Sequence, residues 1–127
     1  MPITYTVDSD RAIIFEHWSG TVSANELGTY WKHILSDPEV MAIRRTVVDL
    51  REATIGFMGW DLEQLIDSVV TPVMKGRTWV TALITGHPVQ VGISNQYSVF
   101  ASHYSKEAIF ADPDAAAAWV LAQPRPE

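Results

Sequence analysis

The pattern of apolar and polar residues at the start of the chain predicts a β-hairpin. Apolar side chains alternate with threonine over residues 3–7, and a β-branched and aromatic run follows over residues 12–18. Such runs are typical of strands, and the Asp-Ser-Asp segment at 8–10 has the composition of a tight turn. We therefore expect two antiparallel strands, the second of which ends at Gly20.

After this hairpin the spacing of apolar residues changes to the period of an α-helix. Ser23 and Glu26 have the serine-to-glutamate spacing of a capping box, which predicts that a helix begins there. The apolar residues of one helical face follow at Leu27, Tyr30, Trp31, Ile34 and Leu35. The Asp37-Pro38 pair should end this helix. The same period predicts three further helices, over residues 60–72, 90–104 and 113–122.

Short apolar or β-branched runs predict three more strands, over residues 46–50, 79–84 and 107–110, with an irregular segment over 51–59. The order ββαβαβαβα needs crossover connections, which indicates an α/β fold with a mostly parallel five-stranded sheet. Its first strand should be antiparallel, and four helices should pack on it; whether they cover one face or both stays open. We expect a single domain over residues 1–122 and a frayed tail over 123–127, which contains two prolines.

Composition and charge narrow the classes of function. A chain of 127 residues with 47% hydrophobic and 19% charged residues is typical of one globular core. Nine Lys and Arg are spread among fifteen Asp and Glu, so nothing predicts the clustered cations that bind nucleic acid. The absence of cysteine excludes disulfides and thiolate metal sites. No apolar run has membrane-spanning length and no signal-peptide pattern is present, so we expect a cytoplasmic protein with no membrane span.

The candidate ligand-binding residues lie where the parallel strands are expected to end. In open α/β sheets ligands bind beyond the carboxyl ends of the strands, so the segments after residues 18, 50 and 84 should share one rim. Trp18 and Trp60 lie at element ends near this rim and are the aromatic residues expected to line a pocket. Polar residues of the same segments complete the set, namely Arg51, Thr54 and His87. Packing in the core accounts for the other three tryptophans.

No pattern predicts a metal, a cofactor or a catalytic residue. The four histidines lack the spacing of metal ligands, and the glycines at 56 and 59 fit neither a dinucleotide loop nor a P-loop. We therefore expect a non-enzymatic protein without a cofactor. The weaker alternative is a hydrolase-like activity that uses His17, Glu52 or His87, which requires a histidine and a carboxylate within hydrogen-bond reach.

The element order and the end of the chain resemble a known family. The order ββαβαβαβα, the Asp49-Leu50 strand end, and the closing Ile109-Phe110-Ala111-Asp112 followed by Ala116 and Trp119-Val120 resemble the SpoIIAA-like (STAS-like) family of small bacterial proteins. The resemblance covers nearly the whole chain. It implies a STAS-type fold, in which anti-sigma-factor antagonists bind partner proteins. These antagonists are switched by phosphorylation of a serine at the start of the helix after the Asp-Leu strand.

The chain departs from that pattern at the position of the switch. Residues 55–60 include no serine or threonine, and Thr54 is the nearest hydroxyl. We therefore expect a STAS-like interaction or regulatory module without the phosphoserine switch. Its partner would be a protein, or a second copy in a homodimer built on uncharged polar residues of the third helix, such as Ser94 and Gln96. The alternative is a domain that binds a small molecule or a lipid in a pocket at the carboxyl ends of the parallel strands. The ligand of such a domain would be small and apolar.

Overall fold

The fold is built on one five-stranded sheet, with the strands in the order β1-β2-β3-β4-β5. In the computed structural model, which describes residues 2–127, β1 is antiparallel to β2 and the other neighbours are parallel. The strands are β1 (Ile3–Asp8), β2 (Ile13–Ser23), β3 (Arg45–Gly56), β4 (Trp79–Ile84) and β5 (Ser105–Phe110). The helices are α1 (Ala24–Ile34), α2 (Pro38–Ile43), α3 (Gly59–Leu65), the π-helical segment η1 (Ile66–Val70), α4 (Thr71–Met74), α5 (Pro88–Phe100) and α6 (Pro113–Ala122).

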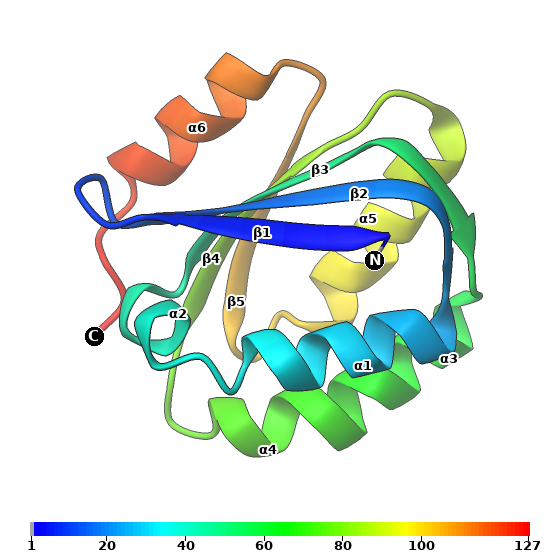
Figure 1. Ribbon diagram of the computed structural model, residues 1–127, viewed down its shortest axis with the longest axis horizontal. Helices are drawn as coiled ribbons and strands as arrows, with labels where there is room; N and C mark the ends of the chain where they lie inside the picture. Colours follow the sequence, from blue (N-terminus) through cyan, green and yellow to red (C-terminus); the bar gives the residue numbers. More distant parts are fainter. Residues whose placement is uncertain (1) are drawn as a thin grey trace.

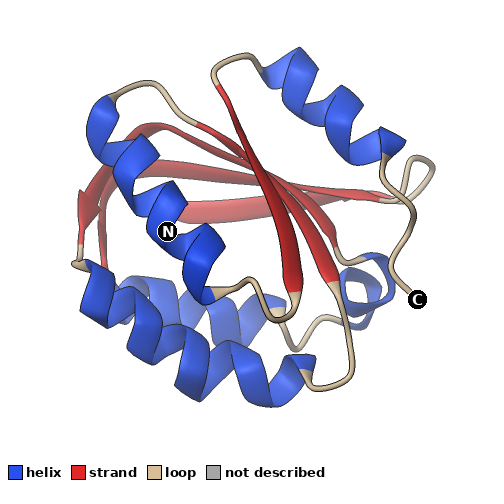
Figure 2. Ribbon diagram, turned by 180° about the vertical axis from the view of Figure 1, so that it is seen from behind, coloured by secondary structure: helices blue, strands red, loops and turns tan. Residues whose placement is uncertain are grey.

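The helices cover the two faces of the sheet unequally. Helices α1, α3, α4 and α5 lie against one face, called the inner face here (Figure 1). Helix α6 alone crosses the other, the outer face (Figure 2). The larger part of the core lies on the inner face, and a smaller cluster joins α6 to the outer face through Ile13, Val47, Ala82, Ile84, Ala116 and Val120. None of the helices in residues 2–127 combines the length and the apolar character that a membrane crossing needs.

The expected mostly parallel five-stranded sheet with an antiparallel first strand is confirmed, but the expectation of four helices is wrong. The additional helix is α2, which begins directly after Asp37. The side chain of Asp37 accepts a hydrogen bond from the backbone N–H of Glu39, and Pro38 occupies the first turn. The Asp-Pro pair therefore ends one helix and also starts the next, because an N-terminal proline has no N–H that needs a partner.

Strands β2 and β3 continue beyond the residues at which the sequence pattern ends them. They stay paired in parallel as far as Ser23 opposite Gly56, so most of the segment 51–59 is strand and Gly20 lies within β2. A register shift just before Gly20, and the left-handed backbone of Gly20 with φ of 65°, allow the pair to bend. Figure 1 shows the two strand ends curving together toward the start of α1.

The helix that follows β3 widens into the π-helical turn η1 ahead of a proline. The backbone N–H of Thr71 donates to the oxygen of Ile66, five residues earlier. Pro72 comes next and has no N–H to donate, and its ring would clash with the preceding turn of a regular α-helix. The wider turn accommodates this ring, so the helical segment continues to Met74.

The last residues of the chain, 123–127, follow α6 without helix or strand. The side chain of Arg45 donates to the backbone oxygen of Gln123 at 3.4 Å, and that of Arg44 donates to the backbone oxygen of Glu127 at 2.5 Å. These hydrogen bonds connect the tail to the start of β3.

The side chain of Gln90 forms hydrogen bonds that connect α5 to the central strand β3. Its side chain is fully buried; Nε2 donates to the carbonyl oxygens of Leu50 and Ala53, and Oε1 accepts from the backbone N–H of Gly86. Pairing between β3 and β4 ends at Asp49, so β4 supplies no donors beyond this point of β3. The glutamine amide takes the place of the missing strand.

We expect Gln90→Leu to lower the free energy of unfolding in urea by about 2–4 kcal/mol, because each buried polar group left unpaired costs about 1–3 kcal/mol. Gln64→Leu, the same change at an exposed position of α3, should alter it by less than about 0.5 kcal/mol. Equal losses in the two variants would contradict this role of Gln90.

Candidate functional site

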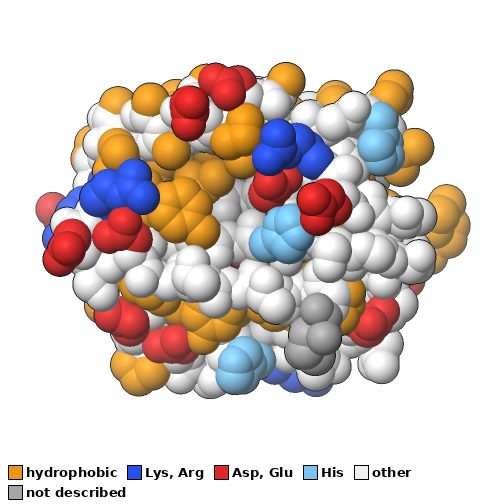
Figure 3. All heavy atoms as spheres, turned by 45° about the horizontal axis from the view of Figure 1, so that its top comes forward, with side chains coloured by type: hydrophobic (Ala, Val, Ile, Leu, Met, Phe, Trp, Pro, Cys, Tyr) orange, Lys and Arg blue, Asp and Glu red, His pale blue; other side chains and the backbone are white. Residues whose placement is uncertain are grey.

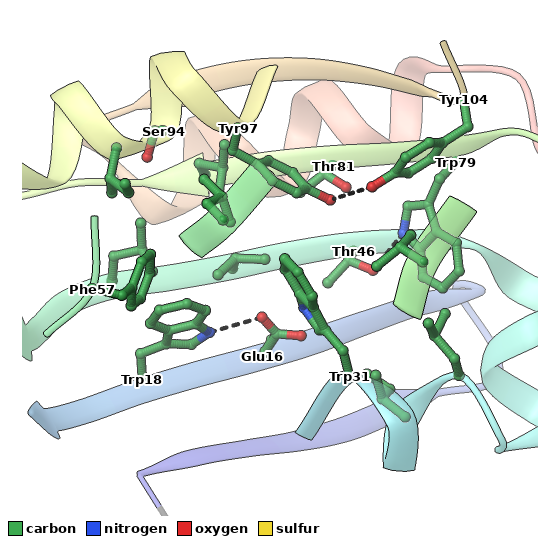
Figure 4. Close-up of a pocket in the computed structure, with 18 residues that line it drawn as sticks. Glu16, Trp18, Trp31, Thr46, Phe57, Trp79, Thr81, Ser94, Tyr97 and Tyr104 are labelled. Atoms are coloured by element: carbon green, nitrogen blue, oxygen red, sulfur yellow. Dashed lines mark hydrogen bonds between the residues drawn. The ribbon is translucent and has the colours of Figure 1, made fainter. Parts of the chain in front are cut away.

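A cavity of about 90 Å³ lies between the inner face of the sheet and the helices. Side chains of β2, β3 and β4 form its floor, and side chains of α1, α3, η1 and α5 form its walls. Six aromatic residues line it, namely Trp18, Trp31, Phe57, Trp79, Tyr97 and Tyr104. Figure 4 shows their rings arranged around this space. A cavity lined mainly by aromatic and aliphatic side chains with a few polar groups is typical of small-molecule sites.

The aromatic rings are fixed by contacts with each other and with the sheet. The ring centroids of Trp18 and Phe57 lie 6.3 Å apart, and those of Trp31 and Tyr97 lie 6.1 Å apart. The indole N–H of Trp79 donates to a threonine hydroxyl of β3 at 2.9 Å. Trp31, Trp79 and Tyr97 are only partly buried, so they form the mouth of the cavity.

One acidic side chain, Glu16 of β2, points into the cavity (Figure 4). The residue is 8% exposed, and both carboxylate oxygens accept hydrogen bonds, one from Nε1 of Trp18 at 2.8 Å and one from the hydroxyl of Tyr30 at 2.7 Å. Burial raises the pKa of Glu16, and the two hydrogen bonds partly oppose this effect. Within the described residues, no Lys, Arg or His lines the cavity and no ion pair reaches Glu16.

Two buried polar atoms near the cavity have no hydrogen-bond partner among the described residues, Oγ of Ser94 and Oε1 of Glu107. Ser94, on α5, is 1% exposed and lines the cavity. Glu107, on β5, lies opposite Thr81 in the sheet, and its Oε2 accepts a hydrogen bond from the hydroxyl of Ser105 at 3.1 Å. Burial raises the pKa of Glu107 to about 8.

A second group of polar residues lies on the outer face of the sheet. A cross-strand row runs from Thr4 through His17 to Asp49. Nε2 of His17 lies 3.0 Å from Oε2 of Glu52, and Arg51 donates to both carboxylate oxygens of Asp49 at 3.0 and 2.9 Å, which lowers the pKa of Asp49. Figure 3 shows histidine, acidic and basic side chains gathered beside a hollow on this face, whose volume is about 260 Å³. The sheet separates this outer-face group from the cavity.

The structure places the five candidate ligand-binding residues in several different surroundings. Trp18 lines the cavity, and Arg51 belongs to the outer-face group. Thr54 is exposed on β3, Trp60 is 68% exposed at the start of α3, and His87 is exposed just before α5. Strands β2 and β3 extend past the last residue of β3 that pairs with β4, and the side chain of Arg51 lies against Gly86, the residue that precedes His87.

Sequence reasoning did not identify Glu16, Ser94 or Tyr97 as site residues. A signal for Glu16 exists, because strand alternation places it on the same face as Ile14 and Trp18, where a charge is unexpected. Ser94 carries no such signal. Its polar neighbours along α5 indicate a solvated or interface face, whereas the rotation of α5 in the structure buries it.

The fold has a counterpart among solved structures. The crystal structure of an uncharacterised protein from the DUF3478 family with a SpoIIAA-like fold, from Shewanella loihica PV-4, matches this chain with a TM-score of 0.61. The chain has a SpoIIAA-like fold. The match covers 93% of each chain at 14% sequence identity, so it confirms the resemblance at the level of the fold alone. No protein-family model matches the sequence, and no curated protein matches it.

The raised pKa of Glu107 predicts how Glu107→Gln changes stability with pH. A carboxyl group whose pKa rises on folding, from 4.5 to about 8, stabilises the fold fully below pH 4.5 and progressively less as the pH rises toward 8. We therefore expect the variant to unfold in urea with a free energy about 1–3 kcal/mol higher than the wild type at pH 7.5, and the difference to shrink toward pH 4.5. Glu52→Gln, at an exposed site, is the control. A difference for Glu107→Gln that stays constant with pH would contradict the burial of this carboxyl group.

Proposed function

We propose that this protein is a non-enzymatic binding module for a small, mostly apolar molecule that occupies the cavity between the inner face of the sheet and the helices. The observation that carries the proposal is the cavity of about 90 Å³, walled by aromatic rings and containing the unpartnered hydroxyl of the buried Ser94. A buried polar group without a partner costs free energy, and a ligand atom at this position would remove that cost.

The volume of the cavity limits the size of the ligand. Apolar protein cavities of about 150 Å³ bind benzene, so a space of about 90 Å³ suits a molecule of roughly four to six non-hydrogen atoms. Small ligands gain at most about 1.5 kcal/mol per atom, and ordinary ones gain much less. We therefore expect dissociation constants of roughly 0.1–10 mM for molecules of this size.

The hydrolase-like alternative rests on the contact between His17 and Glu52. Their side chains are 46% and 68% exposed, so water surrounds both groups. Acid–base pairs are most effective where the surroundings limit the access of water and hold the reacting group, whereas the cavity on the other face is the one lined mainly by apolar side chains. This difference favours the binding role over the enzymatic one.

The role as an interaction module, which the fold resemblance implies, is compatible with ligand binding. Trp31 on α1 and Tyr97 on α5 meet at the mouth of the cavity, so a ligand that enters between them alters the packing of two helices. A partner protein that contacts these helices would sense whether the cavity is occupied. The homodimer expected from α5 stays a prediction, since most of its polar face is exposed while Ser94 is buried.

The proposal is tested by filling the cavity. Ser94→Leu adds apolar atoms to the cavity and removes no hydrogen bond made by the side chain, so the variant should fold. Tryptophan fluorescence in titrations with tert-butanol and tert-butylammonium should report saturable binding of at least one of these compounds to the wild type. Ser94→Leu should weaken that binding at least about tenfold, because the added atoms occupy the ligand's volume.

Ser98→Leu is the matched control, because Ser98 lies one turn later on α5 and does not line the cavity. It should retain wild-type affinity. Absence of binding by both compounds, or unchanged binding by Ser94→Leu, would refute the proposed site.

A further inference from the structure

We propose that the ligand of the cavity is a small organic cation, an alkylammonium ion, whose charge is matched by the Glu16 carboxylate and whose alkyl groups pack among the aromatic rings. This inference rests on the proposed function and names the chemical class of the ligand. It is carried by the combination of one buried acid and several aromatic rings in the same cavity, which no Lys, Arg or His among the described residues lines.

Glu16 supplies the negative charge in a fixed position. Trp18 and Tyr30 each donate to a different carboxylate oxygen, so the group cannot rotate away from the cavity. Both donors are neutral, and within the described residues no Lys, Arg or His forms an ion pair with Glu16 or lines the cavity. A buried carboxylate is costly without an opposite charge, so the cavity is complementary to a cation.

The aromatic rings supply the second part of cation recognition. Trp18, Trp31, Trp79 and Tyr97 line the cavity from both layers, and Figure 4 shows Glu16 pointing into the space between Trp18 and Trp31. The faces of tryptophan and tyrosine rings carry negative electrostatic potential and attract ammonium groups within about 6 Å. An alkylammonium ion places its charge and its apolar groups against the same walls.

The remaining polar group fits an ammonium ion as well. The Ser94 hydroxyl oxygen has no partner and can accept a hydrogen bond from an N–H group. An anion, by contrast, would enter a space in which the one charged side chain among the described residues is acidic. A neutral ligand of the same shape would pack against the rings but would leave Glu16 without an opposite charge.

The test compares two molecules of nearly the same shape, tert-butylammonium chloride and tert-butanol, in titrations of the wild-type protein at pH 7.5 followed by NMR. We expect the cation to bind at least about tenfold more tightly than the alcohol, which corresponds to about 1.4 kcal/mol and lies within the range of cation–π and charge pairing in enclosed sites.

Glu16→Gln should abolish the preference for the cation and leave the affinity for tert-butanol within about threefold of the wild type. Glu52→Gln is the matched control, since Glu52 is an exposed acid on the opposite face of the sheet and its loss should leave the preference unchanged. If Glu16→Gln does not fold, Trp31→Leu, at the partly exposed mouth, should reduce the affinity for the cation more than that for the alcohol.

The outcomes separate this inference from the proposed function. Equal affinities of the wild type for the cation and the alcohol would overturn the cationic ligand and leave the binding function standing. A cation preference that persists in Glu16→Gln would also overturn the inference. If neither compound binds, the inference and the proposed function are both overturned.

Discussion

The two hydrogen bonds that Glu16 accepts connect the sheet to the helical layer. Trp18 donates from the same strand, β2, and Tyr30 donates from α1, so the carboxylate joins β2 to α1 through polar atoms inside the inner core. The carboxylate of Glu16 and the aromatic rings around it do not completely fill the space between the sheet and the helices. The cavity is the volume that remains. The packing of α1 and the chemistry of the cavity therefore depend on the same carboxylate.

Strand alternation divides the functional chemistry of the protein between two faces. Glu16 points inward, and its neighbour His17 points outward into the row that includes Asp49. The inner face is covered by several helices, and the cavity lies between these helices and the sheet. The outer face is crossed by α6 alone, so its charged residues stay in contact with solvent, where ion pairs contribute little free energy. This contrast is why we assign binding to the inner face.

The sequence predicted those features of the fold that depend only on residues close together in the chain. The capping box at Ser23, the apolar run of β4 and the Asp112 cap of α6 all occur as expected, because each is decided by a few neighbouring residues. The bend at Gly20 and the burial of Ser94 were not predictable in this way, since both depend on how distant segments pack. Of the residues that line the cavity, the sequence pointed to Trp18, an aromatic residue at the end of a predicted strand, but not to Glu16, although alternation places Glu16 on the inner face.

Entry of a small organic cation into the cavity on the inner face can be measured directly, because the chain has five tryptophans. In ¹⁵N–¹H NMR spectra recorded during a titration with tert-butylammonium, each indole N–H reports on its own surroundings. We expect shifts for Trp18, Trp31 and Trp79, which line the cavity, and none for the exposed Trp60 or for Trp119 beside the outer face. Shifts confined to Trp60 or Trp119, or no saturable shift at all, would contradict entry into the cavity.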